Sequence, residues 1–507
     1  MSLLSQESSD RRMRRPVAGP LRRHAARGAT VLALMLAGCM TAPDVREPSL
    51  PLTDAALQSR AAAVASEPGL SEEGAPAEWW QLFDDATLSS LQAEATGSNL
   101  DLQAAMARID ESRARLGQTN SALAPQVFAD AGYTRSALSE HSPFAMLGAP
   151  TAAASTWTLG LQAAWELDLR GYLRHLSDSA DARLQASTYG MAAVKVSTAG
   201  EVARIYLLLR GVQSQMAIVE ENGRIAENLV QMAESRQRHG VASRFDAAAA
   251  RADAASIEAR LSQLQQQRDA LMNALAMLLG KSPRELDGRL AGAALPAMPR
   301  RLPIGVPSDL ARKRPDILQA EALLQAAVAD IGAAQADFYP RVSLTGGFGF
   351  QAFDFSDLGS WGSRRFSVGP TLYLPIFQGG RLKSNLALSE SRHRQAGIAY
   401  QQTVLRAWHE VDDALNAYRI ELKRHAQLQL AVAQNETALE VAQRAYQQGT
   451  ADFTSVLVAQ RSRLASQAEL VNSTTASALS VVSLYRALGG GWSPELQAEA
   501  MAPGGAS

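Results

Sequence analysis

The sequence predicts a mixed α+β fold, duplicated along the chain, in which four amphipathic strands alternate with very long helices. Three observations predict it. Four segments alternate apolar and polar residues at period two, and two stretches of about 68 residues contain no proline. Three pairs of glycines lie 209 positions apart: Gly171 and Gly380, Gly240 and Gly449, and Gly280 and Gly489.

The alternating segments lie near residues 126–135, 156–169, 341–352 and 365–377. Alternation over this length is typical of a transmembrane β-barrel strand, although a soluble sheet with one buried face shows the same pattern. If the strands cross a membrane, one set of side chains faces lipid and the other the interior. The lipid set is Trp157, Leu159, Leu161, Phe366, Leu372 and Leu374, and the interior set is Thr158, Glu166, Thr371 and Tyr373.

The proline-free stretches predict helices of unusual length. Within the first, Val202, Ile205 and Leu209 belong to a heptad series that is typical of coiled-coil packing. Each stretch would extend about 100 Å as a helix, which favours a membrane barrel with a long helical extension over an ordinary soluble sheet. Four strands cannot close a barrel, and open edges are not tolerated in lipid, so the membrane part requires several copies of the chain.

These features divide the chain. The first structural repeat spans 79–292 and the second 308–495, and the proline-rich linker at 293–307 separates them. Residues 39–78 are expected to form a flexible tether, and residues 496–507 a disordered tail.

The N-terminus predicts an export signal ending at residue 38. An arginine-rich lead precedes a short apolar run at 29–36, which is too short to span a bilayer. The following Leu-Ala-Gly-Cys resembles the lipobox of bacterial lipoproteins, which implies that Cys39, the only cysteine, carries a covalent lipid. Met40 stands where the family's inner-membrane retention signal has aspartate, which implies the outer membrane. The alternative is an ordinary signal peptide with a chance cysteine.

Composition and motifs argue against nucleic-acid binding and catalysis. The formal net charge is −1 and becomes more negative once the basic lead is removed. His409-Glu410 begins like a zinc-binding motif, but Asp413 occupies the position of the second histidine. We therefore expect no enzyme activity, no metal and no cofactor other than the lipid on Cys39.

Several motifs across the predicted mature chain resemble those of the TolC-like outer-membrane efflux factors of the NodT lipoprotein type. They are Trp-Trp-Gln-Leu-Phe from Trp79, Arg-Pro-Asp-Ile from Arg314, Ala-Asp-Phe-Tyr-Pro from Ala336, Ala-Gln-Arg from Ala459 and Leu-Gly-Gly-Gly-Trp from Leu488.

The resemblance implies a homotrimer in which each protomer gives four strands to a twelve-stranded outer-membrane barrel, continued by a periplasmic α-helical barrel. It implies a passive duct for small molecules, served by a periplasmic adaptor and an inner-membrane pump, typically of the resistance-nodulation-division class. Two alternatives stay open: a TolC-like duct for type I protein secretion, and a periplasmic adaptor lipoprotein.

The same resemblance implies two functional regions near the turns that end the long helices. The adaptor-docking tips would comprise Gly240, Val241 and Ser243 in the first repeat and Gly449, Thr450 and Asp452 in the second. Glycine permits a tight reversal, and Ser243 and Asp452 are expected to cap the following helices.

A periplasmic gate is expected just beyond the tips. Many relatives have an acid before Ala-Gln-Arg, whereas this chain has Val458. We expect Val458 to narrow the pore by apolar contact. We expect Arg461, which shares its helix face, to pair with Asp246 or Asp452.

Overall fold

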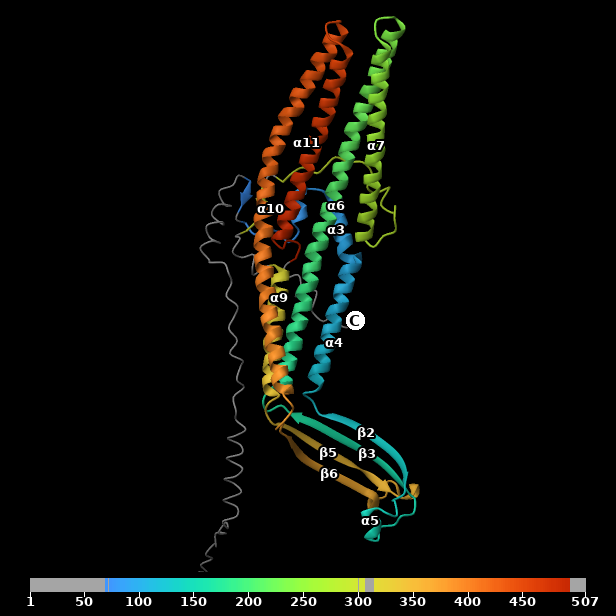
Figure 1. Cartoon of the computed structure of the whole chain (residues 1–507), viewed down its shortest axis with the longest axis vertical. Coiled ribbons are helices and arrows are strands. Elements are labelled where there is room, and N and C mark those ends of the chain that lie inside the picture. The colour runs from blue at the N-terminus through green and yellow to red at the C-terminus, as the bar shows by residue number, and fades with distance from the viewer. Residues whose placement is uncertain (1–68, 72, 300, 306–313, 493–507) are drawn as a thin grey trace, which may run out of the picture. The chain divides into compact units, whose positions relative to one another are not determined.

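The structure of the chain is a computed structural model that describes residues 69–71, 73–299, 301–305 and 314–492. The described residues fold as two units (Figure 1). The strand unit comprises Thr119–Leu176 and Asp330–Ala387, and the helical unit comprises the described parts of Arg46–Gln118, Ser177–Ala329 and Leu388–Ser507. The predicted signal, most of the predicted tether and the predicted tail lie outside the described residues.

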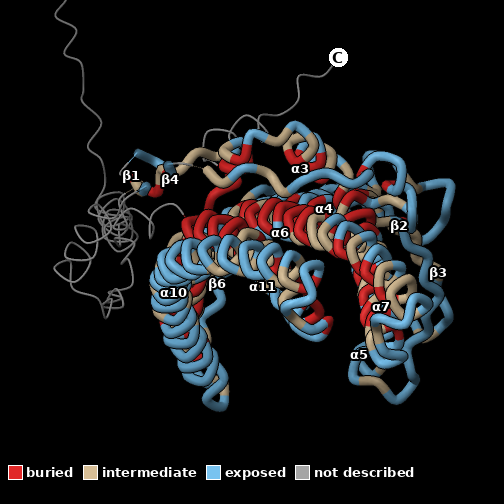
Figure 2. The backbone as a smooth tube through the Cα atoms, turned by 90° about the horizontal axis from the view of Figure 1, so that it is seen from above, coloured by how far each residue is buried: buried red, intermediate tan, exposed pale blue. Residues whose placement is uncertain are grey.

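The two repeats build matching long helices. Helices α6 (Tyr172–Arg238) and α10 (Arg381–Gln447) each span 67 residues, and α7 (Arg244–Leu278) and α11 (Phe453–Ala487) each span 35. In both pairs the second member begins 209 positions after the first. Each proline-free stretch is therefore one helix. Buried residues run along much of α6, whereas α10 is mostly exposed (Figure 2).

The shorter helices follow a different offset. Helices α4 (Leu100–Ser121) and α9 (Pro315–Ala336) each span 22 residues and begin 215 positions apart. The loop at 137–153 in the first repeat is six residues longer than the loop at 353–363 in the second. That difference in loop length accounts for the difference between the two offsets.

The core of the helical unit surrounds Trp79, in the short helix η1 (Trp79–Phe83) that precedes α3 (Ala86–Ser98). The buried Trp79 ring stacks on Tyr485 of α11 with ring centroids 5.5 Å apart, and the Tyr485 hydroxyl donates to the Pro303 carbonyl at 3.0 Å. At Gly490 an added Cβ would lie 2.9 Å from the Trp79 ring. Two motifs that carry the resemblance, at Trp79 and at Leu488, are therefore packing motifs.

The two predicted linkers pair with each other. Strand β1 (Leu70–Ser71) runs parallel to β4 (Leu302–Pro303), and the Leu302 amide donates to the Gly69 carbonyl at 2.8 Å. Leu302 is fully buried in the core. The prediction that the tether stays flexible up to residue 78 is therefore wrong at its described end, because its backbone groups find partners in the inter-repeat segment.

Helix α9 is long and apolar enough to cross a membrane, and no other helix among the described residues meets that test. Half of its most apolar window is buried inside the protein, as in the core helix of a soluble unit. At Gly332 an added Cβ would lie within 2.9 Å of the His175 ring, which shows how closely α9 packs on the first turn of α6. This helix is therefore weak evidence for a helical span.

The strand unit contains one antiparallel sheet in the order β2-β3-β5-β6. The strands are β2 (Gln126–Ser136), β3 (Ala154–Leu167), β5 (Arg341–Ala352) and β6 (Arg364–Tyr373). The β2–β3 loop contains α5 (Pro143–Met146), and the β5–β6 loop contains η3 (Phe355–Asp357) and η4 (Trp361–Ser363). Strands β2 and β6 are the edges, and neither has a second partner among the described residues.

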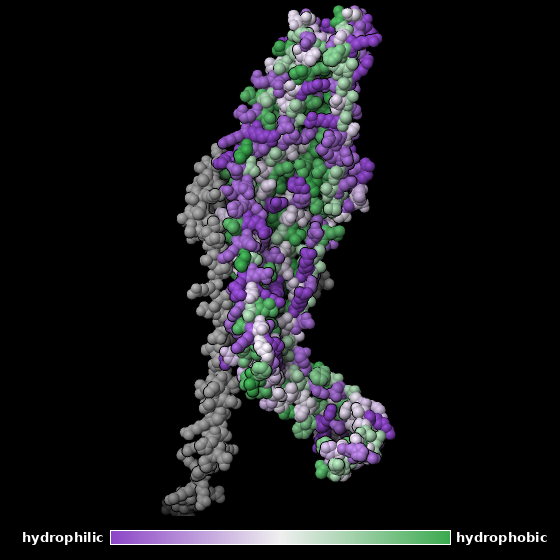
Figure 3. All heavy atoms as spheres, viewed as in Figure 1, coloured by the Kyte–Doolittle hydropathy of each residue, from purple (hydrophilic) through white to green (hydrophobic). Residues whose placement is uncertain are grey.

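The register aligns the predicted faces of all four strands. Leu161 lies opposite Ala129 and Phe348, and Phe348 lies opposite Phe366. Gln162, one residue along, belongs to the other face, which carries most of the polar residues, whereas Arg135 and Arg364 lie on the apolar face at its loop end. Leu161, Phe348 and Phe366 are exposed, and Figure 3 shows hydrophobic and hydrophilic side chains together on the strand unit.

Two strands have boundaries that differ from the expectation by two residues or more. Strand β6 ends at Tyr373 rather than near 377, because Pro375 has no N–H group with which to continue the ladder. Leu374, predicted to face lipid as a strand residue, therefore lies beyond the sheet. Strand β3 begins and ends two residues earlier than the predicted segment.

Candidate functional site: the helix tips and the Arg461 pair

The first helix tip is a glycine turn between α6 and α7. Gly240 has φ of 76°, its amide donates to the Gln237 carbonyl at 3.0 Å, and the Val241 amide donates to the Arg236 carbonyl at 2.9 Å. This pair of bonds is the Schellman motif that ends many helices at a glycine. The left-handed backbone explains why glycine stands at this position.

The second tip, between α10 and α11, has the same motif 209 positions later, and its hydrogen bonds follow the same pattern. Gly449 has φ of 75° and donates to the Tyr446 carbonyl at 3.1 Å, and Thr450 donates to the Ala445 carbonyl at 2.9 Å. Both predicted turns are confirmed in conformation.

The predicted N-caps are also confirmed. The Ser243 hydroxyl accepts from the Asp246 amide at 3.2 Å, and the Asp246 carboxylate accepts from the Ser243 amide at 3.0 Å, which forms a capping box on α7. The Asp452 carboxylate caps α11 by accepting from the Ser455 amide at 2.9 Å. Hydrogen bonds from the Ser455 side chain and backbone lower the pKa of the Asp452 carboxyl, so the cap stays charged at neutral pH.

The surfaces of the two tips differ although their backbones match. Val241 is 65% exposed and Phe245 is also exposed, so the first tip presents apolar side chains to solvent. The position equivalent to Val241 is Thr450, whose hydroxyl donates to the Ala445 carbonyl at 3.0 Å. The first tip therefore offers an apolar contact that the second lacks.

The predicted partner of Arg461 is wrong. The Arg461 Nε donates to the Asp253 carboxylate at 2.7 Å, which joins α11 to α7. Asp246 and Asp452 are engaged instead in capping their own helices. The Asp253 side chain is 7% exposed and that of Arg461 62%, so the pair links a buried acid to an accessible base.

Depth below the tips explains which acid pairs with Arg461. Asp253 lies ten positions after the Ser243 cap, and Arg461 lies nine positions after the Asp452 cap. Because both helices start at the tips, the two residues reach the same level, two helical turns beyond Asp246. Sequence analysis missed Asp253, and counting residues from each cap is the signal that would have found it.

A polar layer lies beside this pair, where α11 meets α6. Gln460 is buried, and its Nε2 donates to the Asn222 Oδ1 at 3.0 Å. Asn222 donates in turn to the Gln467 Oε1 at 3.2 Å. Val458, one turn before Arg461, is exposed. The layer therefore bonds the second return helix to the first long helix.

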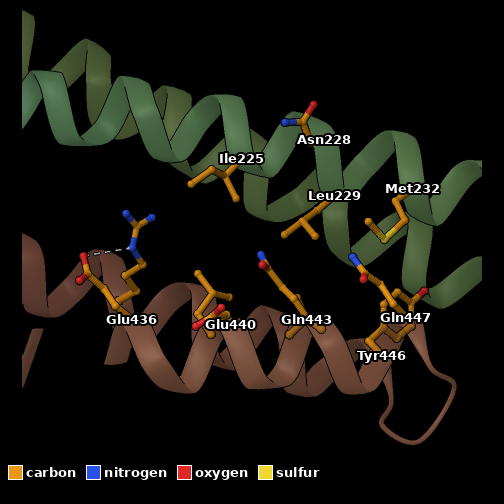
Figure 4. A pocket seen from close by; sticks show the side chains of 12 residues that line it. Ile225, Asn228, Leu229, Met232, Glu436, Glu440, Gln443, Tyr446 and Gln447 are labelled. Atoms are coloured by element: carbon orange, nitrogen blue, oxygen red, sulfur yellow. Dashed lines mark ion pairs between the residues drawn. The ribbon is translucent and has the colours of Figure 1, made fainter. Parts of the chain in front are cut away.

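A groove of about 450 Å³ separates α6 from α10 near the tips (Figure 4). Ile225, Leu229 and Met232 line its apolar side on α6. Carboxylate and amide side chains of α10 line the other side, and Glu436 lies 3.8 Å from Arg463 of α11. The groove thus combines apolar and acidic walls. No group of three potential metal ligands occurs among the described residues.

Comparison with known proteins gives one consistent result. A family model described as Outer membrane efflux protein matches residues 91–281 and 306–490. The chain is 32% identical over 477 residues to the outer membrane protein OprJ of Pseudomonas aeruginosa, covering 92% of this chain and 95% of OprJ. It is 33% identical over 470 residues to the solvent efflux pump outer membrane protein SrpC of Pseudomonas putida, covering 91% and 97%.

A solved structure of the outer-membrane channel OprN matches with a TM-score of 0.83 and 33% identity, covering 90% of this chain and all of that one. The family match includes both repeats and extends through the tips, so it rules out the periplasmic-adaptor alternative. The chain belongs to the outer membrane efflux protein family, and it is the outer-membrane exit channel of an efflux system.

Proposed function

We propose that three copies of this chain close a twelve-stranded barrel in the outer membrane, and that their helices form a periplasmic duct. The duct passively conducts small molecules that an inner-membrane pump, of the resistance-nodulation-division class, delivers through a periplasmic adaptor. One observation carries the proposal: the four-stranded sheet has two unpaired edges and an apolar face that nothing in the described chain covers. In lipid such edges must be paired, and further copies of β2 and β6 supply the partners.

The aromatic residues of the apolar face support a membrane location. At the loop end, Trp157 packs on Tyr133 with ring centroids 4.5 Å apart and on Phe355 at 5.0 Å. At the other end, the Trp165 indole donates to the Leu123 carbonyl at 2.9 Å. The two tryptophans are eight positions apart on β3, which is about 26 Å of strand and about 20 Å of height at the usual strand tilt of about 40°. Outer-membrane barrels have an apolar band about 25 Å tall between two aromatic girdles.

The two sheet faces provide the test. Arginine at Leu161, midway between the tryptophans, should cost about 2–4 kcal/mol because it would face the lipid core. Arginine at the neighbouring Gln162 should cost much less because that residue would face the lumen. Heat-resistant trimer, measured by gel mobility of membrane extracts, reports the difference. Equal loss of trimer in the two variants would contradict the barrel.

The tips and the groove support adaptor docking. The tip residues Gly240, Val241, Ser243, Gly449, Thr450 and Asp452 lie in exposed turns at the ends of the long helices. The groove between α6 and α10 adds an apolar and acidic surface next to them. We assign the adaptor to this end of the duct.

We assign the gate to the segments of α7 and α11 that follow the tips. The Arg461–Asp253 pair ties the return helix of one repeat to that of the other, and the exposed Val458 lies one turn away on α11. Holding α7 and α11 together would keep the duct narrow, and Val458 would narrow it further. Asp246, named with them from the sequence, supports the gate only through its cap on α7.

Lipid on Cys39 would anchor the N-terminus in the outer membrane. Cys39→Ser should abolish metabolic labelling with palmitate and leave an altered precursor. The barrel itself should still insert, because it does not depend on the anchor. Label retained by the Cys39→Ser protein would refute the lipoprotein assignment.

The sequence left a protein-secretion duct open as an alternative function. The relatives support small-molecule efflux instead, since SrpC is named as a solvent efflux protein. The pump and adaptor that copurify with the chain distinguish the two functions, because a secretion duct would recover a protein-exporting transporter.

A further inference from the structure

The polar face of the sheet contains a row of four residues with a distinctive composition. Asp130 on β2 lies opposite Gly160 on β3, Gly160 lies opposite Gly349 on β5, and Gly349 lies opposite Arg365 on β6. In this row the two edge strands therefore carry side chains of opposite charge. The two inner strands have glycine in the row, so no side chain lies between the two charges.

The charged side chains reach toward each other across the whole sheet. Three strand spacings separate their backbones by about 14 Å. The Arg365 Nη2 nevertheless lies 4.0 Å from the Asp130 Oδ2. The two side chains can approach each other over the inner strands because Gly160 and Gly349 have no side chains of their own.

A larger residue at either glycine would meet neighbouring atoms. At Gly160 an added Cβ would lie 3.3 Å from the Asp130 carboxylate, and at Gly349 it would lie 2.4 Å from the Leu159 carbonyl. The first would crowd the acid, and the second would collide with the neighbouring backbone. The glycines are therefore part of the arrangement.

Two glutamines hold the charged groups in place. The Gln162 Nε2 donates to the Asp130 Oδ1 at 3.0 Å, and the Arg365 Nη1 donates to the Gln351 Oε1 at 3.3 Å. Each glutamine lies two residues from one of the glycines, on the same face. A hollow of about 460 Å³ lies over the glycines, and Asp130, Gln162 and Arg365 line it.

The pair contributes little to stability. Its side chains are 32% and 49% exposed and its separation is at the limit for an ion pair, and such accessible pairs contribute at most about 1 kcal/mol. A charged pair over an open hollow is therefore better suited to interacting with passing solutes than to stabilising the fold. Rings of charged side chains set ion selectivity in pores.

We propose that Asp130 and Arg365 form a charge-balanced contact for ionic and zwitterionic solutes inside the barrel. The proposal rests on the proposed function, which makes the polar face the lumen. Arg365 attracts anionic groups and Asp130 cationic ones, and their partial neutralisation keeps the passage nearly unselective. Removing either charge should expose the selectivity of the other.

The test uses the full-length channel in planar lipid bilayers, with reversal potentials measured in a KCl gradient. Arg365→Gln should raise the cation-to-anion permeability ratio about two- to fivefold, because an ion near one uncompensated charge in water gains about that preference. Asp130→Asn should shift the ratio in the opposite direction by a similar factor. The double variant should return toward the wild-type ratio.

Two controls match these variants. Arg364 precedes Arg365, but its guanidinium lies over the Trp361 ring at 4.4 Å, so Arg364→Gln should leave the ratio unchanged. Arg365→Lys keeps the charge and should keep the selectivity. Trimer on gels verifies that each variant assembles.

The outcomes separate the two proposals. Conducting channels whose Arg365→Gln and Asp130→Asn ratios equal that of Arg364→Gln would overturn the charge contact and leave the channel function standing. Wild-type protein that inserts without conducting would overturn the lumen itself, and the charge contact with it.

Discussion

The two repeats build the same joint with different side chains. In the first repeat Asn99 precedes α4 and its amide donates to the Leu278 carbonyl at the end of α7, at 2.8 Å. In the second, Arg314 precedes α9 and donates to the Ala487 carbonyl at the end of α11, also at 2.8 Å. Both residues thus bond the start of a short helix to the last carbonyl of a return helix.

The two joints differ in the charge of the donor side chain and in the partners that this side chain requires. Asn99 is neutral, and its Oδ1 also accepts from the Leu102 amide as an N-cap. Arg314 is a buried cation, and it needs the carboxylates of Asp316 at 2.7 Å and Glu410 at 2.8 Å. Burial alone would lower the pKa of the guanidinium, but the two carboxylates outweigh it and raise the pKa. The two repeats therefore share the hydrogen bond to the last carbonyl of the return helix, but they form it with side chains of different charge.

The long helices show the same divergence in their surroundings. Gly211 of α6 is buried, and an added Cβ would lie 2.4 Å from the Thr475 hydroxyl of α11. The equivalent position on α10 is Ile420, which is 55% exposed. Figure 2 shows this contrast along the two helices. One long helix is covered within its own chain, and the other presents apolar side chains that neighbouring copies would cover in the proposed trimer.

The largest expected effect comes from breaking the charged joint. Arg314→Ala should lower the free energy of unfolding by about 2–3 kcal/mol, because it removes a buried side chain and leaves the Ala487 carbonyl without its charged donor. Asn99→Ala removes a cap and one buried hydrogen bond and should cost about 1–2 kcal/mol. Urea unfolding of the purified protein measures both. Arg314→Lys keeps the charge but not the planar fork, so it should lie between wild type and Arg314→Ala. Equal losses for the alanine variants would show that the charge in the second joint is unimportant.

The next effect concerns the unequal tips. Val241→Ser should weaken adaptor binding about tenfold, because docking would bury an exposed valine side chain. Thr450→Ser keeps the hydroxyl that bonds Ala445 and should leave affinity almost unchanged. Crosslinking yield and surface binding with the copurified adaptor report both values. If the two variants bind alike, the apolar first tip is only a turn.

The smallest effect concerns the contact that joins the repeats. Arg461→Ala should shift the balance between closed and open duct by about 1 kcal/mol, a modest value because the arginine is accessible. Asp253→Asn should act similarly, and the double change should add little if the two residues act as a pair. Antibiotic leakage and single-channel open probability measure the shift.

The pair between Arg251 and Glu234 supplies the matched control. It spans 2.7 Å within the first repeat, with an arginine as exposed as Arg461. Arg251→Ala should therefore leave leakage unchanged. A gate role for Arg461 fails if its alanine variant leaks no more than Arg251→Ala.

Local signals predicted much of the candidate site. Glycine at 240 and 449 predicted the left-handed turns, and Ser243 and Asp452 predicted the caps, because a turn and a cap involve neighbours within a few residues. The partner of Arg461 was not predictable in the same way. Asp253 lies 208 positions away in the chain, and only the parallel descent of α7 and α11 from the tips brings the two together.

The sequence by itself determined the period of every main element: alternation for the four strands, proline-free heptads for the long helices, and a repeat that the equal helix lengths confirm. These follow from the geometry of a single strand or helix, which a local pattern specifies. The tertiary structure alone decided which strands are edges, and it set the row from Asp130 to Arg365. It also decided which carbonyl Arg314 reaches, because contacts between distant segments depend on how the elements pack, and no local pattern encodes that.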